Sequence, residues 1–322
     1  MLDIASADCI HDDLPAIETI FRQELSSAVP CVRELVGHLS RYRGKMLRPA
    51  LLLLSARAVG QVTHDHLVLA AVVEMVHMAT LVHDDVLDEA SLRRQGPTIN
   101  YLHGNEAAVI LGDYLISHSY HLCSSLRSQR AARIVARTTN RLCEGELLQI
   151  SNRDNWDLDE STYMRIITGK TASLCAASCA LGAIFAGADR AATARLRRYG
   201  LCVGRAFQIQ DDILDIVGSQ QEAGKTLGTD LAKGKLTLPV IHFLKNAAPP
   251  QRRAMRRLLA QKDASLAQRI RDMLAGSPSL AYARNAARRW ARRAAGLIAD
   301  LPGSEATRAL RDMAHFAVQR CR

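Results

Sequence analysis

Apolar residues recur along most of this chain at the three- and four-residue spacing that is typical of amphipathic helices. The first such pattern runs from residue 14 to residue 39. Further patterns, together with one long apolar run, predict helices over residues 50–59, 67–82, 106–126, 130–150, 163–188, 195–217 and 236–244, with at least three more in the tail. No linker rich in Ser and Pro and no solenoid repeat separates these segments. The pattern therefore predicts one domain over residues 1–322.

Composition supports an all-α, soluble protein. Aromatic residues make up only 4% of the chain, and runs of β-branched residues are short. Residues 67–82 are short for a membrane span and contain Glu74 and His77, and residues 171–188 lack charges but are mostly small. Eight cysteines without a Cys-x-x-Cys pair indicate reduced thiols in a cytoplasmic protein. The acidic, mixed residues 1–13 do not fit a targeting peptide.

Two of the apolar segments end in the same acidic pattern, Asp-Asp-x-x-Asp. The first comprises Asp84, Asp85 and Asp88, and the second comprises Asp211, Asp212 and Asp215. On a helix, residues four apart share one face with Cβ atoms about 6 Å apart, so Asp84 and Asp88 can act together. A single motif of this kind could be a solvated helix end. Its recurrence in two equivalent settings instead indicates Mg²⁺ bound by carboxylates, with a diphosphate completing the coordination.

The net charge of +10 is concentrated in the tail. Around residues 284–298, five arginines share one helix face, and the other face carries Trp290 and aliphatic residues. This pattern predicts an amphipathic helix docked by its apolar side. Contact with an anionic membrane surface is an alternative. Nucleic-acid binding is disfavoured, because it leaves both acidic motifs unexplained.

Two basic segments resemble phosphate sites. Residues 41–49 place Lys45 and Arg48 beside a helix start, where backbone N–H groups also favour anions. The segment from Gly218 to Thr226 looks like a P-loop, but five residues separate its glycines where the motif has four, and no clear strand precedes it. The first segment is therefore retained as a candidate and the second is rejected as a P-loop.

From about residue 15 to its C-terminus the chain resembles the trans-polyprenyl diphosphate synthases, which have an all-helical isoprenoid synthase fold. The resemblance is carried by motifs in a fixed order: Gly44-Lys45-x-x-Arg48-Pro49, His77, the first aspartate motif, Arg93-Arg94, Lys170-Thr171, Phe207-Gln208, the second aspartate motif, Gly224-Lys225 through Asp230, and Gly234-Lys235-x-Thr237-x-Pro239. It implies a helical bundle around a central active-site cavity. It also implies a homodimer that joins isopentenyl diphosphate to an allylic diphosphate such as farnesyl diphosphate.

The resemblance also implies roles for individual residues. Three Mg²⁺ ions are expected at the six aspartates of the two motifs, namely Asp84, Asp85, Asp88, Asp211, Asp212 and Asp215. Of these, Asp85 and Asp212 have the alternative role of orienting the metal ligands. Seven basic residues are expected to bind the two diphosphates: Lys45, Arg48, His77, Arg93, Arg94, Lys225 and Lys235. Lys170 is expected to stabilise the leaving diphosphate, and Thr171 and Gln208 to lie near the reacting carbon. Gln95 departs from the family's usual Arg-Arg-Gly pattern, so the loop around Arg93 and Arg94 is expected to differ in shape.

Product length is expected to depend on the residues that precede the first motif. Ala79 stands five positions before Asp84, where relatives with short products often carry an aromatic residue, and Met75 lies one turn deeper. The first motif also lacks the two-residue insertion typical of bacterial farnesyl diphosphate synthases. These features predict a long product, roughly octaprenyl, and a farnesyl or geranylgeranyl product is the alternative.

Two other functions are compatible with part of this pattern. A class I terpene cyclase shares the fold and the first motif, but its second metal motif is of a different type, and it has no need of the pocket around Lys45 and Arg48. A non-catalytic prenyl synthase subunit is disfavoured by the intact carboxylates and basic residues.

Overall fold

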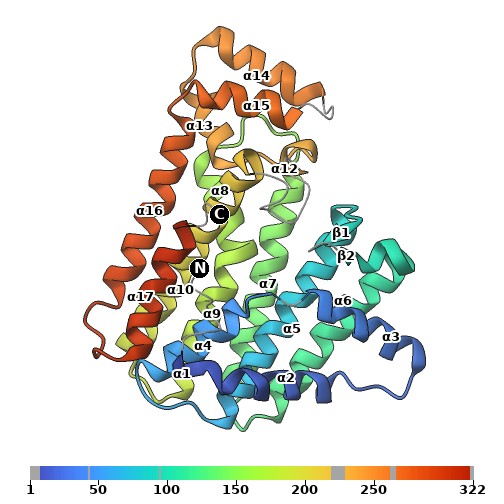
Figure 1. Ribbon diagram of the computed structural model, residues 1–322, viewed down its shortest axis with the longest axis vertical. Helices are drawn as coiled ribbons and strands as arrows, with labels where there is room; N and C mark the ends of the chain where they lie inside the picture. The colour runs from blue at the N-terminus through green and yellow to red at the C-terminus, as the bar shows by residue number, and fades with distance from the viewer. Residues whose placement is uncertain (1–7, 43, 94–95, 219–228, 262–265, 320–322) are drawn as a thin grey trace. The chain divides into compact units, whose positions relative to one another are not determined.

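The computed structural model describes residues 8–42, 44–93, 96–218, 229–261 and 266–319. Helices dominate these residues, as Figure 1 shows, and the strands described are a short antiparallel pair in which Leu92 faces Pro97 and Arg93 faces Gly96. The expectation of an all-α protein is therefore confirmed.

The elements follow one another in this order along the first half of the chain: α1 Asp8–His11, α2 Asp13–Glu24, α3 Pro30–His38, the 3-10 turn η2 Leu39–Tyr42, α4 Leu47–Arg57, α5 His64–Leu87, β1 Leu92–Arg93, β2 Gly96–Pro97, α6 Ile99–Ser125 and α7 Gln129–Ser151. The second half contains α8 Glu160–Ile167, the π-helical turn η3 Thr168–Ala172, α9 Ser173–Phe185, α10 Arg190–Val217, α12 Thr229–Ala232, α13 Leu238–Asn246, α14 Pro249–Gln261, α15 Leu266–Ala275, α16 Ser279–Leu297 and α17 Glu305–Gln319.

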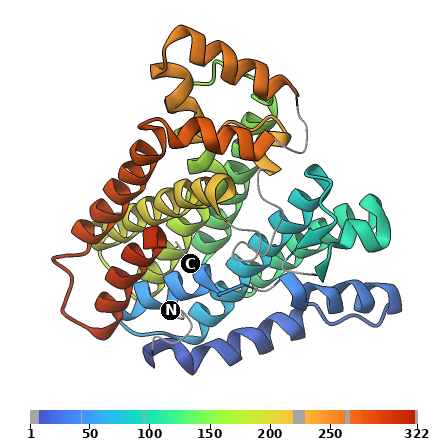
Figure 2. The ribbon, with the colours of Figure 1, turned by 45° about the horizontal axis from the view of Figure 1, so that its top comes forward.

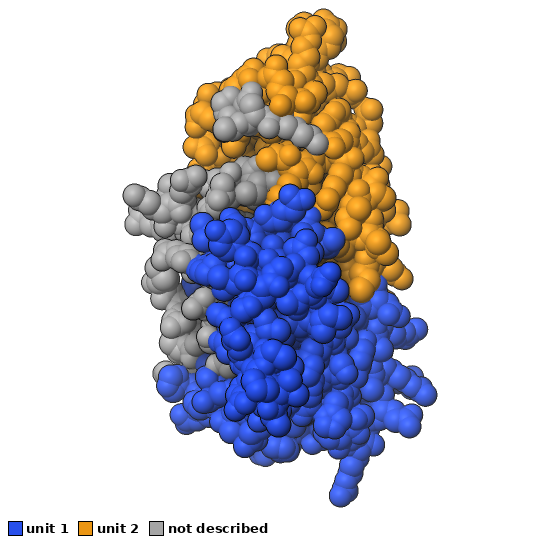
Figure 3. Space-filling view, turned by 90° about the vertical axis from the view of Figure 1, so that its right-hand side faces the viewer, with its two compact units in different colours: residues 1–140, 174–200, 297–313 blue, residues 141–173, 201–296, 314–322 orange. Residues whose placement is uncertain are grey.

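The chain divides into two compact units, coloured separately in Figure 3. Unit 1 comprises residues 1–140, 174–200 and 297–313, and unit 2 comprises residues 141–173, 201–296 and 314–322. Helices α7, α9, α10, α16 and α17 contribute residues to both units. The expectation of one domain over residues 1–322 stays a prediction.

Unit 1 is built on α5, which runs beside α6 (Figures 1 and 2). The side of α5 that faces this core carries Met75, Met78 and Ala79, each 0% exposed, and Phe21 of α2 packs on the same cluster. Because α5 is buried for most of its 24 residues, its apolar character reflects a core helix.

Unit 2 has its own apolar core. Tyr163 and Ile166 of α8, Ile209 and Ile213 of α10, and Val240 of α13 belong to one buried cluster. Helices α14, α15 and α16 add further buried residues to it. The second aspartate motif lies on α10 within this unit, so the core fixes the backbone that carries the motif.

Two expected helices are interrupted in the structure. The pattern over residues 14–39 forms α2 and α3, because Pro30 begins a new helix at a position where its missing N–H costs nothing. The pattern over residues 163–188 contains the π-helical turn Thr168–Ala172, which hydrophobic spacing does not reveal.

Two helical stretches are long and apolar enough to cross a membrane, but both belong to the packed interior. The best windows of His64–Leu87 and Glu160–Phe185 are 72% and 78% buried. Such burial is that of core helices in a soluble protein. On α16 the five arginines are exposed and Ala287, Ala291 and Ala294 are buried, which confirms an amphipathic helix docked by its apolar face. Membrane contact by the arginines stays a prediction.

Candidate active site

The first aspartate motif lies at the end of α5. Asp84 belongs to the last helical turn, and Asp88 follows the helix with its N–H donating to the Asp84 carbonyl oxygen at 2.8 Å. Both carboxylates are partly exposed, whereas Asp85 is 1% exposed. The turn therefore presents Asp84 and Asp88 to solvent and directs Asp85 inward.

Arg93 binds the buried Asp85. Its Nε donates to the two carboxylate oxygens at 2.9 and 3.0 Å, and its Nη2 donates to Oδ1 at 2.7 Å. Burial disfavours the charge of Arg93, but the bond to Asp85 and the nearby Asp84 outweigh burial and raise the pKa of Arg93. This pair links the end of α5 to β1. Metal binding by Asp85 and diphosphate binding by Arg93 stay predictions.

Tyr42 supports this pair and was not singled out from the sequence. Its hydroxyl oxygen accepts the N–H of Ile99 at 3.0 Å, and the Arg93 guanidinium carbon lies 5.9 Å from its ring centroid. Burial, with the carboxylate of Asp85, raises the pKa of Tyr42. No sequence spacing signals this contact, because Tyr42 comes from the 3-10 turn before α4.

The other basic candidates of unit 1 lie on separate elements. Lys45 is exposed before α4, and Met46 caps that helix in the left-handed conformation with φ 49°. Arg48 is half-buried in the first turn, and its Nε is buried without a hydrogen-bond partner among the described residues. His77 is half-buried on α5, seven residues before Asp84. Arg94 and Lys225 lie outside the described residues.

The second aspartate motif repeats one feature of the first. Asp211 is partly exposed, whereas Asp212 is 5% exposed and accepts hydrogen bonds from the Tyr163 hydroxyl at 2.5 Å and from Gln208 Nε2 at 2.8 Å. Burial, with the nearby Asp230 carboxylate, raises the pKa of Asp212 to about 8. Asp215 is also buried, and the N–H of Asp230 lies 3.4 Å from its Oδ2.

A chain of hydrogen bonds joins the expected catalytic residues of unit 2. Thr171 Oγ1 donates to Gln208 Oε1 at 2.8 Å, and the amide of Gln208 in turn donates to Asp212. The bonds fix which end of the Gln208 amide faces each neighbour. The structure thus brings Thr171 and Gln208 together and adds Tyr163. Their place near the reacting carbon stays a prediction.

Lys170 is held by α7. Its Nζ lies 2.5 Å from Glu146 Oε2 and 3.1 Å from Gln149 Oε1. Both Lys170 and Thr171 belong to the π-helical turn η3, a kind of turn that often occurs at functional sites. Glu146 and Gln149 lie within the helix expected over residues 130–150, but no spacing in the sequence pairs them with Lys170.

Two glycines let other helices approach the π-helical turn closely. A Cβ on Gly145 of α7 would lie 2.4 Å from the Lys170 backbone nitrogen, and one on Gly204 of α10 would lie 2.5 Å from the Cα of Ala172. A side chain at either position would therefore displace the turn that carries Lys170 and Thr171.

Lys235 is 5% exposed, and its backbone N–H donates to the Asp230 carbonyl oxygen at 2.8 Å. Gly234 before it has φ +72°, and a Cβ there would lie 2.3 Å from Asp154 Oδ1. The position of Lys235 thus depends on a glycine that can adopt a left-handed conformation.

The two residues expected to influence product length are wholly buried. Ala79 and Met75 are 0% exposed and share a core cluster with Phe21 and Leu115. Their role in product length stays a prediction.

An all-helical fold with two aspartate-tipped helices and basic side chains defines the class of isoprenoid diphosphate enzymes. The sequence model for "Polyprenyl synthetase" matches residues 29–275, so the chain belongs to this family and is a prenyltransferase. It is 34% identical over 311 residues to the octaprenyl diphosphate synthase of Escherichia coli, covering 96% of both chains.

Solved structures agree with the family. A decaprenyl diphosphate synthase from Rhodobacter capsulatus is 37% identical with a TM-score of 0.92, covering 99% of this chain and 98% of that one. A polyprenyl synthase from Caulobacter crescentus, complexed with calcium and isoprenyl diphosphate, is 33% identical with a TM-score of 0.93, covering 98% and 96%.

Proposed function

We propose that this prenyltransferase joins isopentenyl diphosphate to an allylic diphosphate such as farnesyl diphosphate, and so makes a long-chain all-trans polyprenyl diphosphate, roughly octaprenyl. The observation that carries the proposal is the shared construction of the two motifs. In each motif the first aspartate is accessible and the second is buried and held by hydrogen bonds, from Arg93 in one and from Tyr163 and Gln208 in the other.

The donor set fits a divalent metal. Asp84, Asp88 and Asp211 offer partly exposed carboxylate oxygens, which are the ligands that Mg²⁺ prefers. The solved Caulobacter relative, complexed with calcium and isoprenyl diphosphate, supports the pairing of a divalent ion with diphosphate at such a site. When bound, the cations neutralise the diphosphate and stabilise it as a leaving group. We propose Mg²⁺, with three ions, as the native complement.

The basic residues complete the binding of two diphosphates. We assign Lys170 and Lys235 to the allylic diphosphate, where positive charge stabilises the leaving group. Lys170 is held by Glu146 and Gln149, so its ammonium is kept in one place before substrate binds. Lys45, Arg48 and His77 are assigned to isopentenyl diphosphate, and the buried, unpaired Nε of Arg48 leaves it a donor for such a ligand.

The chemistry follows from these assignments. Departure of the diphosphate leaves an allylic cation, and the double bond of isopentenyl diphosphate attacks it and forms the new carbon–carbon bond. A proton is then lost, for which the released diphosphate is the proposed acceptor. Thr171 and Gln208 are proposed to face the cation with oxygen lone pairs, because their mutual hydrogen bond fixes both side chains.

The experiment is incorporation of labelled isopentenyl diphosphate with farnesyl diphosphate and Mg²⁺. Asp84→Asn and Asp211→Asn should each lower the rate by about 10²-fold or more, the size typical of losing one electrostatic contact to a transition state. Asp300→Asn is the matched control, because its carboxylate is 85% exposed and outside both motifs. Wild-type rates in both motif variants would contradict the proposal.

We also propose that the enzyme acts in the cytoplasm as a homodimer, with peripheral membrane contact through the α16 arginines. Exposed apolar residues on α6 support an interface, since Tyr101 is 68% and Ile110 67% exposed. Sedimentation of the purified protein would contradict the dimer if it gave the mass of one chain at micromolar concentration.

A further inference from the structure

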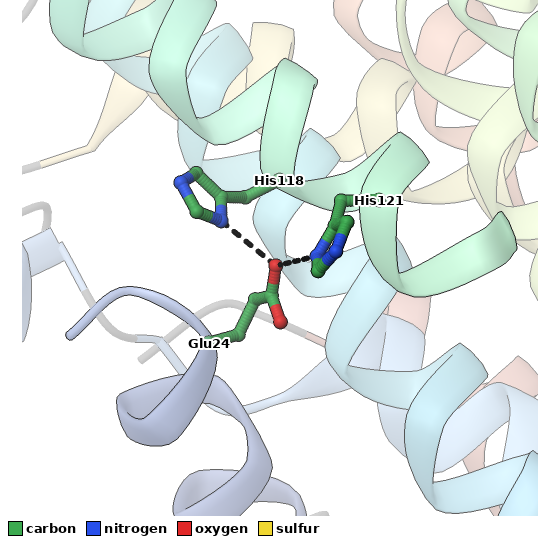
Figure 4. A group of neighbouring side chains, drawn as sticks. All are labelled: Glu24, His118 and His121. Atoms are coloured by element: carbon green, nitrogen blue, oxygen red, sulfur yellow. Dashed lines mark hydrogen bonds and ion pairs between the residues drawn. The ribbon is translucent and has the colours of Figure 1, made fainter. Parts of the chain in front are cut away.

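A cluster of two imidazoles and one carboxylate lies in unit 1, on residues outside both aspartate motifs. His118 and His121 stand one turn apart on α6, and Glu24 is the last residue of α2. Nδ1 of His118 lies 2.8 Å and Nδ1 of His121 lies 2.7 Å from the same oxygen, Oε1 of Glu24. Figure 4 shows the contacts from both rings meeting at this one oxygen, with His118 and His121 on different sides of it.

The surroundings hold two of the three groups in place. The Glu24 side chain is 11% exposed and lies between the buried residues Phe21 and Leu25, which anchor the end of α2. The ring of Tyr114 packs against His118 with centroids 4.2 Å apart. His121 is 73% exposed, so one side of the cluster is open to solvent. The arrangement is thus a fixed carboxylate and a fixed imidazole beside an imidazole at the surface.

This donor set suits a divalent transition-metal ion. Two imidazole nitrogens with one carboxylate oxygen and an open position form a common Zn²⁺ site, whereas Mg²⁺ prefers oxygen ligands. All three potential ligand atoms lie within 4.8 Å of one another. Zn–N and Zn–O bonds of about 2.1 Å in a tetrahedron place the ligand atoms about 3.4 Å apart. Glu24 Oε1, which lies 2.8 Å from His118 Nδ1 and 2.7 Å from His121 Nδ1, therefore needs to retreat by about 0.6 Å from the first and about 0.7 Å from the second.

We propose that Glu24, His118 and His121 form a binding site for a divalent transition-metal ion such as Zn²⁺, with water as the fourth ligand. On binding, the metal takes the lone pair of each Nδ1. An ionised carboxylate only accepts hydrogen bonds, so the contacts with Glu24 require a proton on each Nδ1. When the metal binds, that proton moves through solvent to Nε2 of the same ring, which stays neutral. The ion links the end of α2 to α6 and stabilises unit 1. This site is separate from the aspartate motifs and independent of the proposed reaction.

A second cluster provides an internal control. Glu34, His38 and His103 also bring their potential ligand atoms within 4.8 Å, and the His38 and His103 rings are 5.1 Å apart. Glu34 is exposed there, whereas the Glu24 side chain is 11% exposed, so the Glu24 carboxylate is the more firmly held of the two. The structure therefore favours the Glu24 cluster as the tighter site.

The test is titration of the full-length, EDTA-stripped and reduced protein with Zn²⁺, followed by calorimetry and by thermal unfolding. Wild type is expected to bind one tight equivalent and to unfold at a temperature that rises with Zn²⁺ concentration. His121→Ala should weaken this binding by about 10-fold or more and reduce the shift at each Zn²⁺ concentration. It should fold normally because the side chain is exposed. Glu24→Gln, which keeps the shape but not the charge, should also weaken binding.

Two comparisons locate the ion. His103→Ala should bind Zn²⁺ as wild type does, and Co²⁺ in the tight site should give visible ligand-field bands without a thiolate charge-transfer band. Equal affinity of wild type and His121→Ala, loss of binding in His103→Ala, or a thiolate band would each overturn the proposal. His121→Ala is expected to keep its prenyltransferase activity at saturating Mg²⁺. A loss of activity together with unaltered Zn²⁺ affinity would also count against the proposed metal site.

Discussion

Gly145→Ala tests whether the close approach of α7 to the π-helical turn positions Lys170. A Cβ at this position would lie 2.4 Å from the Lys170 nitrogen and 2.8 Å from the carbonyl carbon of Gly169. Both neighbours are backbone atoms that cannot rotate away. To restore an ordinary contact of 3.4 Å, the two backbones must part by about 1 Å.

The expected cost has two parts. Overpacking of this kind lowers the free energy of unfolding by about 1–3 kcal/mol. The displacement also moves the Lys170 ammonium relative to Glu146 and Gln149, which lie on the same helix as Gly145. A misplacement of about 1 Å in a group that acts on the reacting atoms can lower the rate by about 10²-fold.

Steady-state kinetics and thermal unfolding would be measured for Gly145→Ala and for Gly296→Ala. The second variant is the matched control, because Gly296 is an exposed position of α16 in the same unit and a Cβ there would have nothing within 4 Å. In that setting Ala for Gly is expected to leave the rate unchanged and stability equal or slightly higher. Wild-type stability and rate in Gly145→Ala would refute the packing argument.

Three further outcomes are expected. Arg93→Met should lower the free energy of unfolding by about 3–5 kcal/mol in denaturant titrations, because it leaves the buried Asp85 carboxylate without the guanidinium. Arg93→Lys should lower it less. Equal stability of wild type and both variants would contradict the importance of this pair. Burial lowers the pKa of His66 below 6.5, so the unfolded chain binds a proton at a higher pH than the folded one, and stability should fall as pH drops below about 6.5. Denaturant titrations should show a flatter pH profile for His66→Asn, and identical profiles would rule out this cause. Ala79→Phe should shorten the product, and it should also destabilise unit 1 because Ala79 is 0% exposed. Products would be measured by chromatography, and unfolding of the same variant would be measured alongside. Long products from a folded variant would contradict the assignment of product length to Ala79.

Sequence periodicity was enough to predict the helical class and most of the helices, because buried and exposed positions alternate with the helical repeat. Helix α16 is a clear case, since its arginines are exposed and Ala287, Ala291 and Ala294 are buried. Helix α5 was predictable for a different reason, because the long apolar run 67–82 marks a core helix. The break before α3 was missed, although Pro30 is a recognised helix start. The π-helical turn at Lys170 depends on backbone packing against Gly145 and Gly204, which no single-sequence pattern encodes.

Contacts that join distant segments could not be predicted. Tyr163 and Asp212 are 49 residues apart in the chain and meet only because α8 and α10 share the core of unit 2. Glu24 lies 94 residues from His118, and neither stands in a metal-binding motif. The aspartates themselves were predictable because their spacing of four residues is local to one helix.

The most direct measurement of the central claim is the chromatographic length of the products formed from farnesyl diphosphate and isopentenyl diphosphate with Mg²⁺. We predict a ladder that ends in a long all-trans polyprenyl diphosphate, with no product after EDTA treatment and recovery when Mg²⁺ is restored. Turnover of farnesyl diphosphate alone to a cyclic hydrocarbon, or no turnover of any allylic primer with Mg²⁺ present, would contradict the account.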